Sequence, residues 1–448
     1  MTEIYFCFDT EDFTQPLAWE ASKQEAQLLE KHGIKGNFNV VGYLAREWMK
    51  NGRYDVPAAL LKHNIGFHSL RHSYHPTICE YTDLESYDEA RALLLKYENE
   101  GLGMVKAATG LDHFDFACPP GSSLSYVAMY EYAEMDMPVY LGSVFTFKDG
   151  KSTWMCNAVH TNYDYYLENL FIKGGIFDVT NYETKSFLDH IAGRKRVFLA
   201  THPTRAYFDD FWDIVNYNGS NKHEMYQWET PPRNSEADTA KFFAEFEKLI
   251  LALKADDRFV IRDVKYLADK ARKDMTSRVV TFDQLPEIKR QLQENFFFVT
   301  LPGVTLSLTD CFAAAAHFTA SREPFKPGFV RGFLSSPVGV TAPVSLWADE
   351  VKALAASYKP DTFLKPCYAI HGKVVGPADL LFAMLDVAMG AESVTLTPRP
   401  QLPELTGDYK PLQKFNLRGK HWIHRPDFED NYISNRLRLQ SWTIRDEI

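Results

Sequence analysis

Short apolar runs and longer amphipathic stretches alternate along about the first 270 residues of the chain. The short runs predict strands at 4–8, 35–41, 65–68, 114–117, 138–144, 176–180, 196–201 and 259–261. The longer stretches, with apolar residues at helical spacing, predict helices at 19–32, 44–49, 57–63, 83–100, 240–253 and 264–272. Such alternation is typical of parallel strands joined by crossover helices, so we expect an α/β fold.

The first predicted strand runs directly into three carboxylates, Asp9, Glu11 and Asp12. Clustered carboxylates repel one another, and burying one is costly unless it is paired. The ordinary interpretation is an acidic surface loop that solvates the end of a strand. A bound cation or a catalytic task would also explain the cluster.

Two histidines favour the second interpretation. The segment His68-Ser-Leu-Arg-His72 places two imidazoles four residues apart, which on a helical turn would face the same way. Two histidines and one carboxylate are a common ligand set for zinc and other divalent metals. Asp9, His68, Pro120 and His202 each follow a predicted strand, and chemistry in parallel α/β folds gathers at those carboxyl ends.

Residues 204–239 interrupt the alternation with a long stretch of little periodicity that is rich in aromatic residues. Long ordered loops in compact domains are usually lids or binding loops. We therefore expect Trp212, within this insertion, to contact a substrate. The alternative is a surface loop without function.

The pattern changes near residues 273–285, which predicts a barrel domain at 1–275 and a smaller α+β domain at 276–400. The smaller domain holds a faint internal repeat, Gly303 to Asp310 and Gly372 to Asp379, in which each Asp is expected to cap a helix. Residues 401–448 read as an irregular tail that packs back on the body, with a strand at 435–444.

Composition excludes some partners. The formal charge of −10 and the lack of a basic block argue against nucleic acid or an anionic membrane as the main partner. No uncharged apolar run approaches the length of a membrane span. The six cysteines are scattered without a Cys-x-x-Cys pair, which predicts a reduced, cytoplasmic protein, although a leader trimmed from the chain stays open. Nothing in the sequence indicates the oligomeric state.

Five segments together resemble the polysaccharide deacetylase family, the fourth family of carbohydrate esterases. They are Phe8–Phe13, Gly36–Gly42, His68–His72, Cys118–Pro120 and Leu199–Pro203, and their order, spacing and strand context are similar to the motifs of that family. The later part of the smaller domain, with Pro360 and Pro366 ahead of it, resembles a pseudomurein-binding repeat in outline.

The deacetylase resemblance implies a distorted (β/α) barrel, one divalent metal and removal of acyl groups from amide nitrogen. It places Asp9 as the general base, His202 as the general acid, and His68 and His72 as metal ligands. The usual third ligand position is Thr10 here, so that role passes to Glu11 or Asp12. Zinc is the expected metal, with cobalt, nickel or another transition metal as alternatives.

The third motif departs from the family pattern. Its Arg, which normally orients the base, is replaced by Cys118, and a thiol cannot form the charge-assisted pair that Arg gives a carboxylate. Either Arg71 or Arg205 substitutes, or the base is poorly held. Cys118, Pro120 and Gly121 are expected to border the substrate.

Three functions follow as hypotheses. The first is a metal-dependent hydrolase that removes an N-acyl group, acetyl in the first place, from a sugar or glycan. The second is a hydrolase of a small cyclic or linear amide. The third is a catalytically weak relative that binds glycan without turning it over.

Overall fold

The structure is a computed structural model that describes residues 1–121, 123–142, 144–145, 147, 150–172, 182–417 and 422–447. The strand expected at 176–180 lies outside the described residues. The chain forms two compact units. The first comprises residues 1–151, 160–269 and 416–433, and the second comprises 152–159, 270–415 and 434–448.

The first unit is built on a curled, mainly parallel sheet, which confirms the expected α/β fold. Its strand order is β5-β4-β3-β2-β1-β9-β8, and β10 pairs with β1. The strands are β1 (Thr2–Thr10), β2 (Asn37–Val40), β3 (Asn64–Phe67), β4 (Phe116–Ala117), β5 (Val139–Leu141), β8 (Tyr165–Tyr166), β9 (Arg196–Thr201) and β10 (Phe259–Arg262); β7 (Ala158–Thr161) begins in the second unit.

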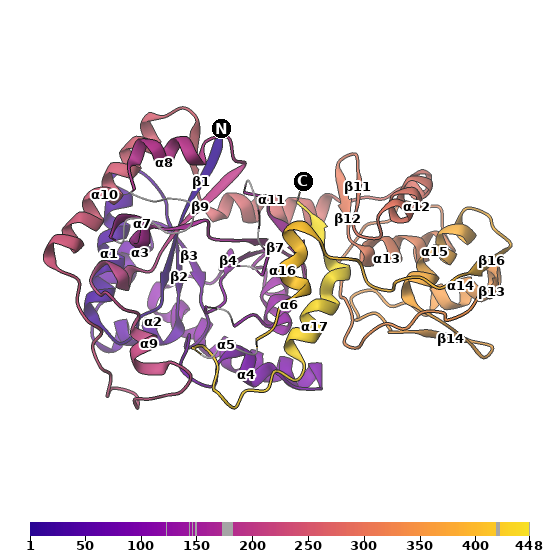
Figure 1. The fold of residues 1–448 in the computed structure, drawn as a ribbon, viewed down its shortest axis with the longest axis horizontal. Helices are drawn as coiled ribbons and strands as arrows, with labels where there is room; N and C mark the ends of the chain where they lie inside the picture. Colours follow the sequence, from indigo (N-terminus) through magenta and orange to yellow (C-terminus); the bar gives the residue numbers. More distant parts are fainter. Residues whose placement is uncertain are drawn as a thin grey trace. The chain divides into compact units, whose positions relative to one another are not determined.

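Strand β1 lies at the centre of this sheet (Figure 1). It pairs in parallel with β9, with β10 along its first half and with β2 along its second half. Every residue from Ile4 to Phe8 is completely buried, because helices cover one face and the interior of the curled sheet fills the other. Phe6 packs against Phe246 of α10, and Phe8 stacks on Phe38. All these strands run the same way, so the chain segments that follow them meet at one edge.

The helices of the first unit surround this sheet; α1, α2 and α10 lie beside β1 and β2 in Figure 1. They are α1 (Pro16–Lys31), α2 (Gly42–Lys50), α3 (Asp55–Leu60), α4 (Ile78–Thr82), α5 (Tyr87–Thr109), α6 (Tyr126–Glu134), α7 (Leu167–Phe171), α8 (Thr184–Ile191), the 3-10 turn η1 (Pro203–Ala206), α9 (Trp212–Tyr217) and α10 (Glu236–Ala255), and α11 (Val264–Ser277) continues into the second unit.

Helix α5 differs from the expected helix at 83–100. It begins after the N-cap Ser86 and continues through Gly101 to Thr109, where Gly110 ends it in a left-handed conformation. Gly101 does not break the helix because it is a packing site: a Cβ there would lie 2.7 Å from the Cα of Leu70. The helix thereby supports the loop that carries His68 and His72.

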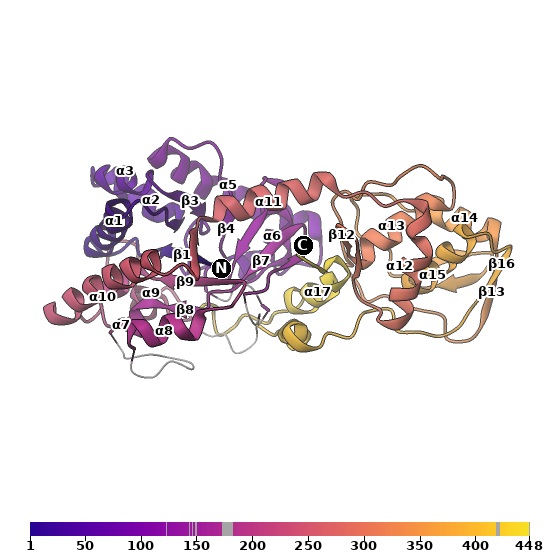
Figure 2. The ribbon, with the colours of Figure 1, turned by 90° about the horizontal axis from the view of Figure 1, so that it is seen from above.

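The second unit has its own helices and short antiparallel strand pairs (Figure 2). They surround one core, which includes Phe312, Leu381 and Trp442. The elements are β6 (Thr153–Met155), η2 (Phe282–Gln284), α12 (Leu285–Glu294), β11 (Val299–Leu301), β12 (Val304–Leu306), α13 (Leu308–Phe318), β13 (Val344–Trp347), α14 (Ala348–Ala356), β14 (Tyr368–Ile370), β15 (Lys373–Val375), α15 (Pro377–Ala388), β16 (Ser393–Leu396), η3 (Gly407–Tyr409), α16 (Lys410–Gln413), α17 (Ile433–Leu439, its first residue in the first unit), η4 (Gln440–Thr443) and β17 (Arg445–Asp446).

The two copies of the internal repeat each form a hairpin followed by a helix, β11-β12-α13 and β14-β15-α15. Asp310 and Asp379 are not the N-cap residues expected from the sequence. Each stands at the third helical position and accepts a hydrogen bond from the backbone N–H of the N-cap, Ser307 at 2.9 Å and Gly376 at 3.0 Å. At Ser307 the capping is reciprocal, because the Ser307 hydroxyl accepts a hydrogen bond from the Asp310 N–H at 3.1 Å, whereas Gly376 has no side chain to do so.

The strand expected at 435–444 is wrong, because the chain there forms α17 and η4. Leu437 and Gln440 are buried at helical spacing from Ile433. The start of α17 is capped by Asp83, whose carboxylate accepts hydrogen bonds from the N–H groups of Asn431, Tyr432 and Ile433 at 2.7, 2.7 and 3.0 Å. A cap supplied from so far away in the sequence leaves no local signal.

Candidate active site

Glu11, His68 and His72 come together at the carboxyl edge of the sheet. The carboxylate of Glu11 lies 2.9 Å from Nε2 of His72 and 3.4 Å from Nε2 of His68. Each residue offers a ligand atom, and these three atoms lie within 4.8 Å of one another. Burial alone would raise the pKa of Glu11, but His72 and His68 outweigh it and hold that pKa well below its usual range.

The loop between the two histidines is not the helical turn expected from the sequence. Ser69 and His72 both have left-handed backbone angles, with φ of 68° and 51°, and the Ser69 hydroxyl accepts a hydrogen bond from the His72 N–H. Such conformations are costly and persist only where the surrounding structure holds them, and they are often found at functional sites. Here they turn both imidazoles toward Glu11.

The tautomer of His68 follows from its hydrogen bond. Its Nδ1 lies 2.9 Å from the carbonyl oxygen of Cys118, which can only accept, so Nδ1 carries the proton. In the neutral imidazole this arrangement leaves the lone pair on Nε2, the nitrogen that lies 3.4 Å from the Glu11 carboxylate. This buried atom has no hydrogen-bond partner within the described chain, which fits the site of a metal ligand.

Helix α9, within the long insertion, supports Glu11 and His72. The indole Nε1 of Trp212 donates to Glu11 at 3.2 Å, and the carboxylate of Asp213 lies 3.6 Å from Nδ1 of His72. Burial raises the pKa of Asp213 to about 6. The expectation that Trp212 contacts substrate is therefore corrected: its side chain is completely buried and orients Glu11.

Asp12 has a different role. Its carboxylate accepts hydrogen bonds from the N–H and hydroxyl of Thr14 at 2.8 and 2.7 Å, and from the hydroxyl of Thr204 at 2.8 Å. Burial raises its pKa to about 7. Asp12 thus links the turn before α1 to η1 through hydrogen bonds. The sequence left open whether Glu11 or Asp12 is the third ligand, and in the described structure only Glu11 lies with the two histidines.

Asp9 is held by two neutral donors. The amide of Asn39 and the hydroxyl of Tyr163 each donate to its Oδ1 at 2.8 Å. Asn39 faces Asp9 because the two are register partners on β2 and β1. The thiol of Cys118 lies 3.4 Å from the Tyr163 hydroxyl, and burial raises the pKa of that thiol to about 11.

His202 lies on the other side of Asp9, with its Nε2 3.7 Å from Oδ2 of Asp9. Its Nδ1 is 2.8 Å from the carboxylate of Glu168, at the start of α7. Burial alone would lower the pKa of His202, but Glu168 outweighs this effect, together with Glu11 and Asp9, and raises it to about 9. The imidazole is therefore protonated near neutral pH.

These groups open into a cavity of about 530 Å³. Its wall includes both charged groups and aromatic rings. The lining residues are Asp9, Glu11, His72, Cys118, Pro119, Gly121, Gly142, Tyr163, Tyr166, Glu168, Asn169, His202, Phe211, Asp213, Ile214 and Trp422. Cys118 and Gly121 border the cavity, whereas Pro120 and Trp212 are not among the described residues that line it.

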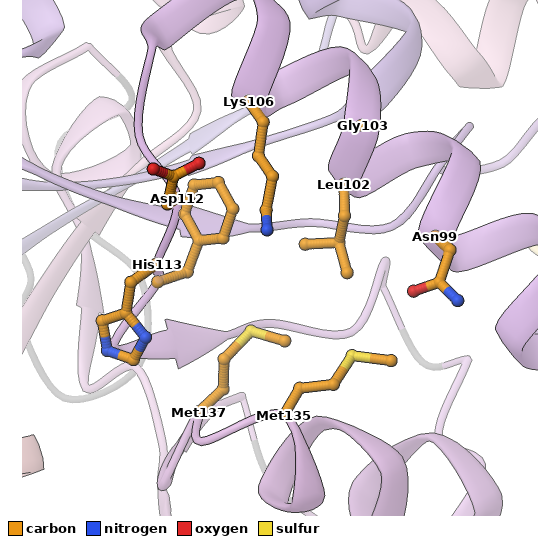
Figure 3. A pocket seen from close by; sticks show the side chains of 9 residues that line it. Asn99, Leu102, Gly103, Lys106, Asp112, His113, Met135 and Met137 are labelled. Carbon is orange, nitrogen blue, oxygen red and sulfur yellow. The ribbon is translucent and has the colours of Figure 1, made fainter.

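A second hollow, of about 370 Å³, lies before the starts of β4 and β5 (Figure 3). Lys106 and Leu102 of α5, His113, and the methionines 135 and 137 line it. The carboxyl edge of the sheet holds the first cavity, so this hollow is separate from the groups that line that cavity.

Sequence reasoning missed Asn39, Tyr163, Glu168, Asp213 and Trp422. A signal existed for Asn39, because two parallel strands in register place it opposite Asp9. Tyr163 and Glu168 flank the two-residue strand β8, which is too short to show a pattern. Trp422 lies more than two hundred residues beyond the other lining residues.

No known family model and no curated protein matches the chain. Solved structures do match, and they include members of the family that the motifs resemble. A protein from Mycobacterium smegmatis assigned to the polysaccharide deacetylases has 12% sequence identity and a TM-score of 0.42, with 61% of this chain and 90% of that chain covered.

Two further matches differ in what they do. The peptidoglycan deacetylase PdaC of Bacillus subtilis has 16% identity and a TM-score of 0.31, with 65% of this chain and 96% of that chain covered. A carbohydrate-esterase family 4 pseudoenzyme of Bacillus anthracis has 13% identity and a TM-score of 0.33, with 60% and 66% covered. Such distant likenesses carry no argument about activity, so we argue function from the residues of the site.

Within the described residues, no helix is both long and apolar enough to cross a membrane.

Proposed function

We propose that the protein is a metal-dependent hydrolase that removes an N-acyl group, acetyl in the first place, from an amino sugar or glycan. One observation carries the proposal. Asp9, Glu11 and His202 offer ligand or proton-transfer atoms within 4.8 Å of one another, directly beside the Glu11, His68 and His72 cluster. A base, an acid and a metal-ligand set close to one another are what metal-assisted amide hydrolysis needs.

In this proposal Asp9 is the general base. Its Oδ1 is occupied by the two donors, Asn39 and Tyr163, while Oδ2 is directed toward His202. A carboxylate fixed by two hydrogen bonds keeps one lone pair oriented toward the cavity. It takes the proton from the water molecule that attacks the acyl carbon.

His202 is the general acid. Amide hydrolysis needs a proton on the leaving nitrogen, because an amide anion is a very poor leaving group. Glu168 fixes the orientation of the ring through Nδ1 and favours its protonated form, so Nε2 holds the transferable proton at the cavity. The stacked ring of Tyr166, with centroids 5.3 Å apart, limits rotation of the imidazole.

Glu11, His68 and His72 would hold the divalent metal. The ligand types, two imidazoles and a carboxylate, suit zinc, with cobalt or nickel as alternatives. When bound, such an ion lowers the pKa of water and polarises a carbonyl group. Trp212 and Asp213 keep the ligands in place from behind, and such supporting hydrogen bonds typically change metal affinity about 10–100-fold.

Two alternatives share this site. A hydrolase of a small cyclic or linear amide would use the same base and acid. A glycan-binding relative without turnover is favoured by the absence of the motif Arg, and it is disfavoured by the two hydrogen bonds that hold Asp9.

The test is release of acetate and free amine from N-acetylated sugars and from acyclic N-acetyl amides, by the zinc-loaded chain. Asp9→Asn is nearly isosteric and should preserve the fold. Its turnover should fall by about 10²–10⁴-fold, the usual contribution of a general base. His202→Ala should lose turnover too, but less on amides with an activated leaving amine.

Two results would contradict the proposal. An Asp9→Asn chain as active as the parent would remove Asp9 from the mechanism. A parent chain that binds sugars but releases no acyl group from any of them would favour the binding protein.

A further inference from the structure

We infer that Trp422 is a substrate-binding residue that presents its indole face to the ring of an N-acyl amino sugar. This inference rests on the proposed function and names the substrate class of the same cavity. Trp422 lies in residues 416–433, the segment with which the chain returns to the first unit after about 150 residues in the second unit.

The segment that carries Trp422 is fastened to the first unit. The carbonyl oxygen of Trp422 accepts a hydrogen bond from the Gly219 N–H at 3.1 Å, within the insertion. The ring nitrogen of His424 lies 3.2 Å from the hydroxyl of Thr77, and the Arg425 N–H donates to the carboxylate of Glu80 at 2.6 Å. Trp422 is therefore placed at the cavity by its own backbone contact and by the contacts of His424 and Arg425, which follow it closely in the chain.

Gly121 makes room for the indole. A Cβ at this position would lie 2.3 Å from a carbon of the Trp422 ring, far inside contact distance. The residue also has a left-handed backbone angle, with φ of 52°, which favours glycine. The Trp422 ring can therefore approach this closely only because residue 121 has no side chain.

The cavity wall matches a sugar ring better than an acyclic amide. Trp422, Phe211 and Tyr166 are each only partly buried and border the same cavity as Asp9 and His202. Aromatic faces pack on apolar C–H groups, and a pyranose ring carries such a face together with hydroxyl groups at its rim. The volume of about 530 Å³ lies within the range of about 300–1,000 Å³ typical of small-ligand sites.

The test separates binding from turnover. In the full-length Asp9→Asn chain, loaded with zinc, calorimetry measures the affinity for the N-acetylglucosamine trimer. Trp422→Ala should weaken binding by roughly three- to tenfold, the worth of one aromatic contact. Trp422→Phe should weaken it less, and Gly121→Ala should weaken it because the new methyl group displaces the indole.

Trp347→Ala is the matched control, since that tryptophan is 66% exposed in the second unit and its loss should leave the affinity unchanged. Equal affinities for the Trp422→Ala, Trp422→Phe and parent chains would overturn the inference, and so would failure of the Asp9→Asn chain to bind the trimer. If the chain with Asp9 intact releases no acyl group while sugar binding still depends on Trp422, the proposed function fails and this inference stands.

Discussion

Asp9 matches the pattern that the chain resembles, but the residues that hold its carboxylate do not. Where that pattern has a positively charged guanidinium, Asp9 accepts hydrogen bonds from the neutral groups of Asn39 and Tyr163. Neither candidate Arg takes the vacant role in the described structure, because Arg71 lies over the ring of Tyr97 and Arg205 over that of Phe211. We expect Tyr163 to be a positioning residue for the base.

Tyr163→Phe removes one of the two donors and leaves the ring in place. A hydrogen bond to a charged group contributes about 1.5–3 kcal/mol, so kcat should fall roughly ten- to hundredfold. Because the hydroxyl contacts the base, KM should change little. Steady-state kinetics on an N-acetylated sugar check this division between kcat and KM.

Tyr207→Phe is the control for that experiment, since the hydroxyl of Tyr207 donates to Gln24 at 3.0 Å. It should match the parent. A Tyr163→Phe chain with unchanged kcat would show that Asn39 alone is enough to hold Asp9.

At the scale of elements, the sequence was sufficient to predict the central strands and the residues at their carboxyl ends. Strand β9 falls at its expected residues, and β1, β2 and β3 lie within two or three residues of theirs. Their parallel pairing brings Asp9, His68 and His202 to one edge. The family motifs lie on these strand ends, which is why the sequence found most of the site.

The sequence was insufficient where a contact comes from far along the chain. The insertion was expected to reach substrate through Trp212, but α9 turns that indole inward onto Glu11. Helix α17 was expected to be a strand because Leu437 and Leu439 alternate with arginines. The chain forms a helix there instead, and its start is capped by the distant Asp83. Neither contact is visible in a local pattern.

Helix α1 carries an unusual burial that makes stability depend on pH. Glu25 is completely buried, and neither of its carboxylate oxygens has a hydrogen-bond partner within the described chain. Burial, and then the nearby charge of Glu168, raise its pKa well above the usual range. A raised carboxyl pKa favours the protonated form in the folded state, so its contribution to stability is lost as pH rises.

Glu25→Gln should therefore gain stability over the parent as the pH rises. The difference should be small near pH 4 and grow above about pH 5 by up to about 1.4 kcal/mol per pH unit, until the folded-state pKa is passed. Urea midpoints measured across this range check the trend. Glu30→Gln, at an exposed position of the same helix, is the matched control substitution. A constant difference between the Glu25→Gln and parent chains would mean that Glu25 does not titrate with a raised pKa.

At the scale of the whole molecule, the chain divides differently from the sequence-based domains at 1–275, 276–400 and 401–448. The first unit ends its main segment at residue 269, and it regains residues 416–433 from the tail region. Residues 152–159 belong to the second unit although they lie between strands of the first. A change in hydrophobic pattern marks one boundary, but it does not reveal a chain that leaves a unit and returns.

The return of the chain brings Trp422 to the cavity, where we propose that it binds the substrate. The role of the second unit, including its likeness to a pseudomurein-binding repeat, stays a prediction. A site made of residues 9 to 422 depends on correct folding of most of the chain.

The central claim is that Glu11, His68 and His72 form a divalent-metal site beside Asp9. Elemental analysis after loading with zinc and desalting tests it most directly, on the parent, on His72→Ala and on His113→Ala as a control from the separate hollow of Figure 3. We predict about one zinc per chain for the parent and the control, and a loss of about tenfold or more for His72→Ala, which removes one of three protein ligands. A His72→Ala chain that retains as much zinc as the parent would contradict the account.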